Sequence, residues 1–343
     1  MSLLKYPDTM NRKQLFEEFA SGRGIGKIKL FSPILMHFAA RHIDRSYAAF
    51  ASDYRVLVEA NIRAMGDFGM DMVSLISDPY RETAAFGARI EFPEEAVPRC
   101  IDKVIKSTDD IHSLKVPDVY KNERTLDRIK GAEEYSRILK GEVPVIGWIE
   151  GPLAEACDLA GVSEMLMMLM MDPDSSGLLL DKCTEMAKKF AAAQVEAGCD
   201  IIGMGDAVCS QVDPDTYSNF VMGRQREIIS FIHGLGARVK LHICGDISHL
   251  LPLIKETGAD IIDLDWQVSP GKATEILGHD TILCGNINPV LIQDKPPDEV
   301  FLLTEKLINE NSDRKLIVSA GCEITVDTPA ENLKAMARAA KSL

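Results

Sequence analysis

Eight short apolar runs recur along the chain, and stretches with helical patterns separate them. Apolar runs that alternate with helices are typical of βα units and of a parallel sheet. Eight is also the number of strands that closes a TIM barrel. The sequence therefore predicts an α/β fold, a (β/α)8 TIM barrel. The predicted strands are residues 33–39, 71–78, 143–151, 200–206, 238–244, 259–265, 281–287 and 315–322.

The barrel accounts for most of the 343 residues, but not for all of them. We expect residues 1–30 to form a helical extension, so that the barrel itself occupies about residues 31–343. The segment between the second and third strands is too long for one helix, and residues 88–140 are predicted to hold further helices. No linker rich in Ser, Gly or Pro divides the chain, which favours a single domain.

Composition excludes several classes of protein. The net charge of −14 argues against binding to nucleic acid, because phosphate contacts need clustered Lys and Arg. No apolar run reaches the 18 or so residues of a membrane span, and the N-terminus lacks the apolar core of a signal peptide. We expect a cytoplasmic protein without a membrane partner. Its eight cysteines are scattered along the chain, which favours reduced thiols over a disulfide framework.

Two further stretches could suggest a cofactor site. The run MLMMLMM at 165–171 is interpreted as adaptable core packing on a helix, because Met side chains fill irregular gaps. The sequence GMGD at 203–206 lacks the glycine spacing and the Lys of a phosphate-binding loop.

In a TIM barrel the functional residues come from the carboxyl ends of the strands. We therefore take the polar and aromatic residues at these predicted ends as candidates. Asp78 and Asp206 are candidate catalytic acids, although either could instead serve as a hydrogen-bond acceptor or a loop cap. Trp148 and Asn286 are candidate contacts for a cofactor. The remaining strand-end candidates are His37, Glu150, Cys209, His242, Cys244, Asp246, Asp263, Asp265, Asn288, Cys322 and Glu323.

The stretch KLHICGDISH at 240–249 sets a His and a Cys two residues apart at a predicted strand end. Residues i and i+2 of a strand point to the same face, so His242 and Cys244 should lie side by side. A catalytic zinc ion takes three such ligands and leaves a fourth position open. Cys322, at the end of the eighth strand, could supply the third ligand.

Other residues compete for the third position. Cys209 lies near another strand end and stays open as a ligand. Cys284 sits inside a strand, where a small buried thiol is the commoner use, and His249 should turn away on the following helix. The alternative to a metal site is a core His beside a buried thiol.

Five stretches resemble the uroporphyrinogen decarboxylase superfamily, in order and over nearly the whole chain. Within it, HICG at 242–245 and SAGCEI at 319–324 are similar to the zinc-dependent methylcobamide:coenzyme M methyltransferases. The five stretches are SDPYRETAAFGARI (77–90), GWIEGPLAEACDLAGVSEML (147–166), GCDIIGMGDAVCSQVDPDTYSNFV (198–221), HICGDISHLLPLIKETGADIIDLDW (242–266) and GNINPVLI (285–292).

The resemblance implies a site and an activity. It implies that His242, Cys244 and Cys322 bind Zn²⁺, and that Asp78 contacts the substrate. The implied reaction moves a methyl group from a corrinoid such as methylcobalamin, carried by a separate corrinoid protein, to a small thiol such as coenzyme M. Relatives of the decarboxylases often form homodimers, so a homodimer is possible here too.

Other activities of the same superfamily stay open. Transfer in the opposite direction would take a methyl group from a methoxy or methylamine donor to the Co(I) corrinoid. A metal-free decarboxylase or tetrapyrrole-binding protein is the third alternative. The segment SPILMHFAARHIDRSY at 32–47 lacks the AGRY-type motif of the decarboxylases, which counts against decarboxylation.

Overall fold

Eight parallel strands form the centre of the molecule. The computed structural model describes residues 10–23 and 28–342. The strand order is β1-β10-β9-β8-β7-β6-β5-β2, and each pairing in this sheet is parallel. This arrangement confirms the predicted TIM barrel. The strands are β1 (Leu30–Phe31), β2 (Val73–Ser74), β5 (Val145–Glu150), β6 (Ile201–Gly205), β7 (Arg238–His242), β8 (Ile261–Asp263), β9 (Ile282–Ile287) and β10 (Leu316–Ala320).

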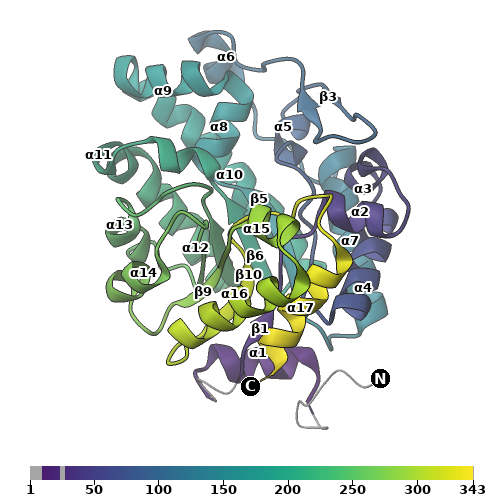
Figure 1. Ribbon diagram of the computed structural model, residues 1–343. Coiled ribbons are helices and arrows are strands. Elements are labelled where there is room, and N and C mark those ends of the chain that lie inside the picture. Colours follow the sequence, from purple (N-terminus) through teal and green to yellow (C-terminus); the bar gives the residue numbers. More distant parts are fainter. Residues whose placement is uncertain (1–9, 24–27, 343) are drawn as a thin grey trace.

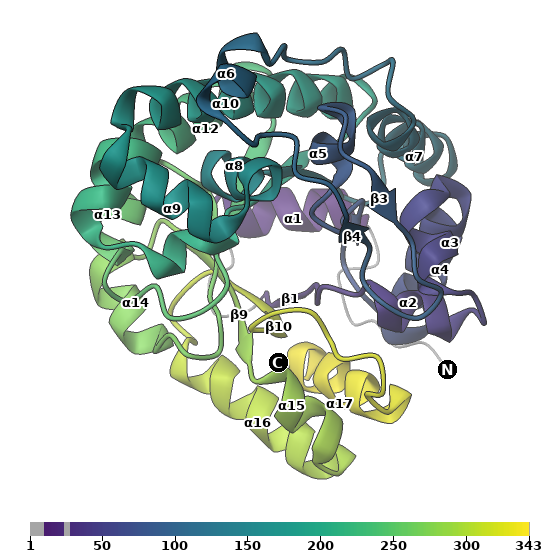
Figure 2. The ribbon, with the colours of Figure 1, turned by 90° about the horizontal axis from the view of Figure 1, so that it is seen from above.

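Helices surround the sheet, as the view from above shows (Figure 2). Their bounds are α1 (Arg12–Ala20), α2 (His37–His42), α3 (Tyr47–Ser52), α4 (Tyr54–Phe68), α5 (Arg81–Ala85), α6 (Thr108–Ser113), α7 (Glu123–Leu139), α8 (Pro152–Ala160), α9 (Val162–Met171), α10 (Pro173–Glu196), α11 (Pro214–Thr216), α12 (Gly223–Gly234), α13 (Leu251–Lys255), α14 (Pro270–Leu277), α15 (Pro289–Asp294), α16 (Pro297–Glu310) and α17 (Ala330–Lys341). A 3-10 turn, η1 (Ala207–Gln211), and a π-helical turn, η2 (Tyr217–Met222), join β6 to α12.

Alternation along the strands divides the apolar residues between two clusters. In β5, Ile146 and Trp148 belong to the cluster inside the barrel, whereas Val145 and Ile149 pack outward against the helices. The same period of two places Lys240 and His242 on the inner face of β7, because Val239 and Leu241 belong to the outer cluster. The last inward-facing residue of each strand is therefore the one that reaches the upper mouth of the barrel.

Helix α1 closes the lower end of the barrel. Its apolar face, with Leu15, Phe16 and Phe19, belongs to the same cluster as the inward-facing strand residues. Figure 1 shows α1 below the sheet, at the end opposite α6 and β3. The carboxyl ends of the strands therefore form the open end of the barrel.

The two edges of the sheet meet through one acidic residue. Asp71, just before β2, accepts a hydrogen bond from the Phe31 amide through Oδ2 at 2.7 Å. The Asp71 amide donates in return to the Phe31 carbonyl at 2.9 Å. Lys341 of the last helix lies 3.6 Å from the other Asp71 oxygen. A buried carboxylate thus joins β1, β2 and α17.

Two local predictions differ from the structure. The first strand is residues 30–31, and the predicted run 33–39 instead leads into α2, which begins at His37. Pro33 has no amide hydrogen for a sheet ladder, and a short apolar run does not distinguish a strand from a helix. The segment 88–140 contains α6 and α7, but also an antiparallel hairpin of β3 (Ile90–Glu91) and β4 (Arg99–Cys100). Residues 1–9 and 24–27 of the expected extension lie outside the described residues.

The methionine run is only partly a core feature. Met165 is buried, whereas Met170 and Met171 on the same helix are 87% and 83% exposed. The interpretation of the run as core packing was therefore wrong for the last turn of α9. Across residues 10–23 and 28–342, none of the helices combines the length and apolar character needed to cross a membrane.

Loss of the Asp71 carboxylate should destabilise the fold. Asp71→Ala would leave the buried Phe31 amide without its acceptor and would remove the acid beside Lys341. We expect the free energy of unfolding in urea to fall by about 2–4 kcal/mol. Asp280→Ala, at an exposed position, should change it by less than about 0.5 kcal/mol. Equal stability of the two variants would contradict the role of Asp71 in joining β1 and β2.

Candidate metal centre and its cavity

Strand β7 delivers a His and a Cys to the mouth of the barrel. His242 is the last residue of the strand, and its Nε2 lies 3.0 Å from the Sγ of Cys244. The two side chains lie side by side, as the spacing of two residues predicts. Gly245 then turns the chain with a positive φ of 91°, and its amide donates to Asp265 at 3.0 Å. The loop that carries Cys244 is therefore held to the neighbouring strand end.

Cys322 joins this pair from the loop after β10. Its Sγ lies 3.8 Å from that of Cys244, and the three ligand atoms of His242, Cys244 and Cys322 all fall within 4.8 Å of one another. In a tetrahedral zinc site with Zn–S bonds of about 2.3 Å, two sulfur ligands are about 3.8 Å apart. The cluster therefore fits a zinc ion. Hydrogen bonds from Cys244 and then His242 lower the pKa of Cys322 to about 4, although burial alone would raise it.

A buried acid fixes the orientation of the His242 ring. Asp263, at the end of β8, lies with its Oδ2 3.0 Å from His242 Nδ1. Lys240 is buried inside the barrel and forms an ion pair with the same oxygen at 3.0 Å. Burial would raise the pKa of Asp263, but the Lys240 charge and the His242 hydrogen bond lower it to about 2. With Nδ1 engaged in this way, Nε2 is the nitrogen that faces the two thiols.

A cavity of about 170 Å³ opens beside the cluster. Its floor includes the indole of Trp148, whose ring centre lies 6.0 Å from that of His242. Two inward-facing glycines make room for this ring, because a Cβ on Gly203 would lie 2.2 Å from Trp148 Cε3 and one on Gly205 3.2 Å from its Nε1. The cavity is lined by Ile34, Met36, Ile76, Asp78, Pro79, Trp148, Glu150, Gly205, Ala207, His242, Cys244, Cys322 and Glu323.

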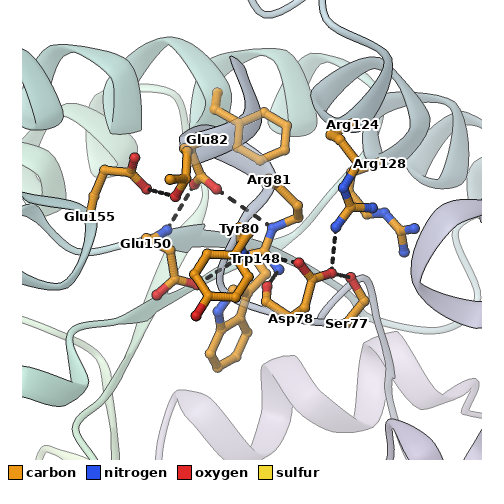
Figure 3. Close-up of polar contacts among 12 residues, drawn as sticks. Ser77, Asp78, Tyr80, Arg81, Glu82, Arg124, Arg128, Trp148, Glu150 and Glu155 are labelled. Carbon is orange, nitrogen blue, oxygen red and sulfur yellow. Dashed lines mark hydrogen bonds and ion pairs between the residues drawn. The ribbon is translucent and has the colours of Figure 1, made fainter. Parts of the chain in front are cut away.

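One wall of the cavity consists of buried ion pairs (Figure 3). Asp78 accepts from Arg124 at 2.5 Å and from Ser77 at 2.6 Å. Arg81 donates to Glu150 at 2.7 Å and to the Asp78 carbonyl. Burial would raise the pKa of Asp78, but the charges of Arg124 and Arg81 lower it to about 2. Asp78 and Glu150 therefore reach the cavity as acids whose cationic partners lie behind them.

A further acid, Glu323, faces the cavity from the side of Cys322. Its Oε1 accepts a hydrogen bond from the amide of His37 at 3.0 Å. Burial raises the pKa of Glu323 to about 7. The lining of the cavity thus carries Glu323 next to Cys322 in the chain, in addition to Asp78 and Glu150.

Asp206 and Asn286 lie outside the lining of this cavity. Asp206 follows the inward-facing Gly205, so its side chain turns away and accepts from the Ala154 amide at 2.7 Å and from Gln225 at 2.8 Å. Asn286 donates to the carbonyls of Asp265 and Val268 at 3.0 and 2.7 Å. Both side chains therefore hold neighbouring loops, and the catalytic role of Asp206 and the cofactor role of Asn286 stay predictions.

The rival ligands also lie elsewhere. Cys209 is buried against Gln225, and Cys284 is buried inside the barrel near Lys240. His249 directs its Nε2 to the carbonyl of Val212 at 3.0 Å. Among the described residues, His242, Cys244 and Cys322 form the one cluster with metal-ligand spacing.

Comparison with known proteins places the chain in a family. The family model for uroporphyrinogen decarboxylase (URO-D) matches residues 16–343. The chain belongs to the uroporphyrinogen decarboxylase family. This confirms the resemblance inferred from the five sequence stretches.

Relatives within the uroporphyrinogen decarboxylase family carry two kinds of name. The methylated-thiol:coenzyme M methyltransferase of Methanosarcina mazei is 29% identical over 229 residues, which are 66% of this chain and 60% of that protein. The methylcobamide:CoM methyltransferase MtaA of Methanosarcina barkeri is 29% identical over 202 residues, 58% of each chain. The uroporphyrinogen decarboxylase of Citrifermentans bemidjiense is 27% identical over 281 residues, 80% of each chain. The matched region thus spans less than two thirds of the two methyltransferases.

The fold of this family member matches a solved structure closely. A methyltransferase from Methanosarcina mazei superposes with a TM-score of 0.89 at 22% identity, over 97% of this chain and 99% of the other. A B12-independent methionine synthase from Shewanella sp. W3-18-1 gives a TM-score of 0.59 at 14% identity, over 91% of this chain and 97% of the other. At these identities the comparison supports the barrel fold alone.

Removal of Asp263 should weaken metal binding without removing a ligand. In Asp263→Ala the His242 ring loses the acceptor that orients it, and we expect zinc affinity to fall about 10- to 100-fold. Asp263→Asn keeps an acceptor oxygen and should lose less. Competition with a chromophoric chelator measures both affinities, with circular dichroism as the check on folding. Unchanged affinity in a folded Asp263→Ala protein would contradict this role.

The ion pair of Asp78 should make a pH-dependent contribution to stability. Its folded pKa of about 2 is below the ordinary value of 3.8, so the contribution is present above about pH 4 and is lost as the pH falls towards 2. At neutral pH, Asp78→Asn should cost about 3 kcal/mol because Arg124 and Arg81 stay buried. The difference in unfolding free energy from wild type should shrink between about pH 5 and 2.5. A constant difference would contradict the assignment.

Proposed function

We propose that this protein is a zinc-dependent methyltransferase that moves a methyl group from a methylated corrinoid to a small thiol. The observation that carries the proposal is the cluster of His242, Cys244 and Cys322 beside a cavity at the open end of the barrel. Three ligands of this kind, with space for a fourth, are the arrangement of a catalytic zinc site. The names of two relatives support part of this reaction: both name coenzyme M, and one of them names a methylcobamide.

A free thiol is a poor nucleophile at neutral pH, since its pKa is about 8.5. Zinc held by the three ligands would bind the substrate sulfur as its thiolate. The chemistry that zinc and the corrinoid would supply is nucleophilic displacement: the sulfur would form a C–S bond to the methyl carbon as the Co–C bond breaks, and the electron pair of that bond would leave with the corrinoid. We propose that the corrinoid is presented by a separate corrinoid protein, which docks over the mouth of the barrel.

The chain's own residues position and shield this chemistry. Asp263 orients His242, and Asp265 fixes the loop that carries Cys244. Trp148, Ile34 and Ile76 give the cavity an apolar floor that excludes water from the attacking sulfur. Glu150 and Glu323 line the same cavity, and either can accept the proton that the thiol loses. Asp78 shapes the wall through its pair with Arg124.

A decarboxylase in the same family would have no use for a cluster of one His and two Cys with zinc spacing. The cluster therefore favours the methyltransferases among the relatives. Two soft thiolate ligands also favour activation of a thiol over polarisation of an ether oxygen, for which harder carboxylate ligands are better suited.

Zinc content and methyl transfer should fall together when a ligand is replaced. We expect about one zinc ion per wild-type chain, and loss of zinc and of methyl transfer from methylcobalamin to coenzyme M or a related small thiol in His242→Ala and in Cys322→Ser. The matched variants His279→Ala and Cys100→Ser, both outside the cluster, should keep both properties.

The possible results separate the alternatives. Zinc without transfer to any thiol would favour the opposite direction, from a methoxy or methylamine donor to Co(I) corrinoid. A protein that binds no zinc when refolded or purified with it would favour the metal-free decarboxylase or tetrapyrrole-binding alternative. Retention of zinc by both ligand variants would contradict the assigned cluster.

A further inference from the structure

The charges around the cavity restrict the substrate. Three carboxyl groups line it, those of Asp78, Glu150 and Glu323. Among the described residues, the lining contains neither lysine nor arginine. Its one basic side chain is His242, which the proposed function assigns to the metal. The proposed zinc ion carries two positive charges, but the thiolates of Cys244 and Cys322 offset them. An anionic tail that entered this cavity would therefore meet acids and apolar surface without an uncompensated cation.

The nearest guanidinium groups are already committed to these acids. Arg81 is completely buried, and its terminal nitrogen donates to Glu150 at 2.7 Å while Nε lies 3.6 Å from Glu82. Arg124 is paired with Asp78 at 2.5 Å and also donates to the Ala51 carbonyl. Figure 3 shows Arg81 between Glu82, Glu150 and Asp78, and Arg124 beside Asp78. Neither arginine belongs to the lining of the cavity. A substrate anion would have to compete with carboxylates that are fixed in place.

The rest of the lining also disfavours an anion. Ile34, Ile76 and Trp148 are apolar, and an unpaired anion loses its hydration against such surface at a large cost. An aromatic face beside carboxylates is instead the surroundings in which proteins hold an ammonium group. Protonation of the acids would remove their negative charge, but it would not supply a positive one.

We propose that the cavity takes a small thiol whose tail is uncharged or cationic, and that it discriminates against an anionic tail such as a sulfonate. The inference rests on the proposed function and narrows its substrate class. The preferred thiol of this protein would therefore differ from the coenzyme M named for its methyltransferase relatives, because coenzyme M carries a sulfonate.

Three thiols of equal length provide the test. They are 2-mercaptoethanesulfonate, 2-mercaptoethanol and 2-aminoethanethiol, which differ only in a terminal anion, hydroxyl or ammonium group. With the zinc-loaded full-length protein and methylcobalamin, kcat/KM is measured for each and corrected for its thiolate fraction. We expect the value for the sulfonate to be at least tenfold below the better of the other two. A smaller difference, or a preference for the sulfonate, would overturn the inference.

Variants test whether the carboxyl groups cause the discrimination. The quantity to compare is the kcat/KM of the better of the other two thiols divided by that of the sulfonate. Glu323→Gln removes an acid but keeps an oxygen for the His37 amide, so the variant should fold and should lower this ratio at least threefold. Glu150→Gln would in addition release Arg81 and should narrow it further, provided that the protein folds. Glu299→Gln is the control: Glu299 is exposed on α16 and lies outside the cavity lining, so its replacement should leave the ratio unchanged. An unchanged ratio in Glu323→Gln would overturn the assigned cause.

Calorimetric titration of each thiol into the zinc-loaded protein separates this inference from the proposed function. Weaker binding of the sulfonate without methyl transfer to any thiol would reject the proposed function and support the cavity inference. Methyl transfer with a preference for the sulfonate would support the proposed function and reject the cavity inference. Absence of binding by all three thiols would reject both.

Discussion

Parallel pairing of the strands brings the candidate functional side chains to one end of the molecule. Since all eight strands run in one direction, their carboxyl ends meet at one mouth, and the period of two selects one residue in each pair to face inward. His242 and Asp263 are both inward-facing, on adjacent strands whose register pairs them directly. The hydrogen bond between them follows from this register. The strand register thus fixes the proposed metal ligand His242 beside the acid that orients its ring.

Several charged side chains are buried near the cavity, and each of them is paired with a residue of opposite charge. Lys240, Asp263, Arg81 and Glu150 lie in surroundings where an isolated ion would be very unfavourable. Each is paired, so the cost of removing it from water is largely offset by its neighbour. Pairs of this kind stabilise the fold little compared with apolar packing, but they fix the positions of the groups that line the cavity. The rigidity of the site therefore depends on the completeness of its ion pairs.

Short-range periodicity predicted the barrel and the neighbouring positions of His242 and Cys244. Cys322 lies 78 residues beyond Cys244, and spacing alone left Cys209 as a rival, so the choice of Cys322 depended on the family resemblance. The sequence pattern placed the first strand wrongly at 33–39, where an apolar run suited a helix equally well. Asp206 lies an odd number of residues from the inward-facing Gly203 and Gly205, so its outward direction could have been inferred from the sequence. Asp263 lies two residues from the inward-facing Ile261, so its inward direction could have been inferred too. The pairing of Asp78 with Arg124 could not, since the two are far apart in the chain and no local pattern joins them.

Closure of the lower end by α1 has a kinetic consequence for a reaction with two substrates. In the part of the chain that the structure describes, the mouth is the end of the barrel that no helix closes, and a corrinoid protein seated over it would block access from that end. On the proposed function the thiol must enter first, and the methylated product can leave only after the larger partner has departed. The enzyme would follow an ordered sequence of binding, with turnover governed by how long the partner stays in place.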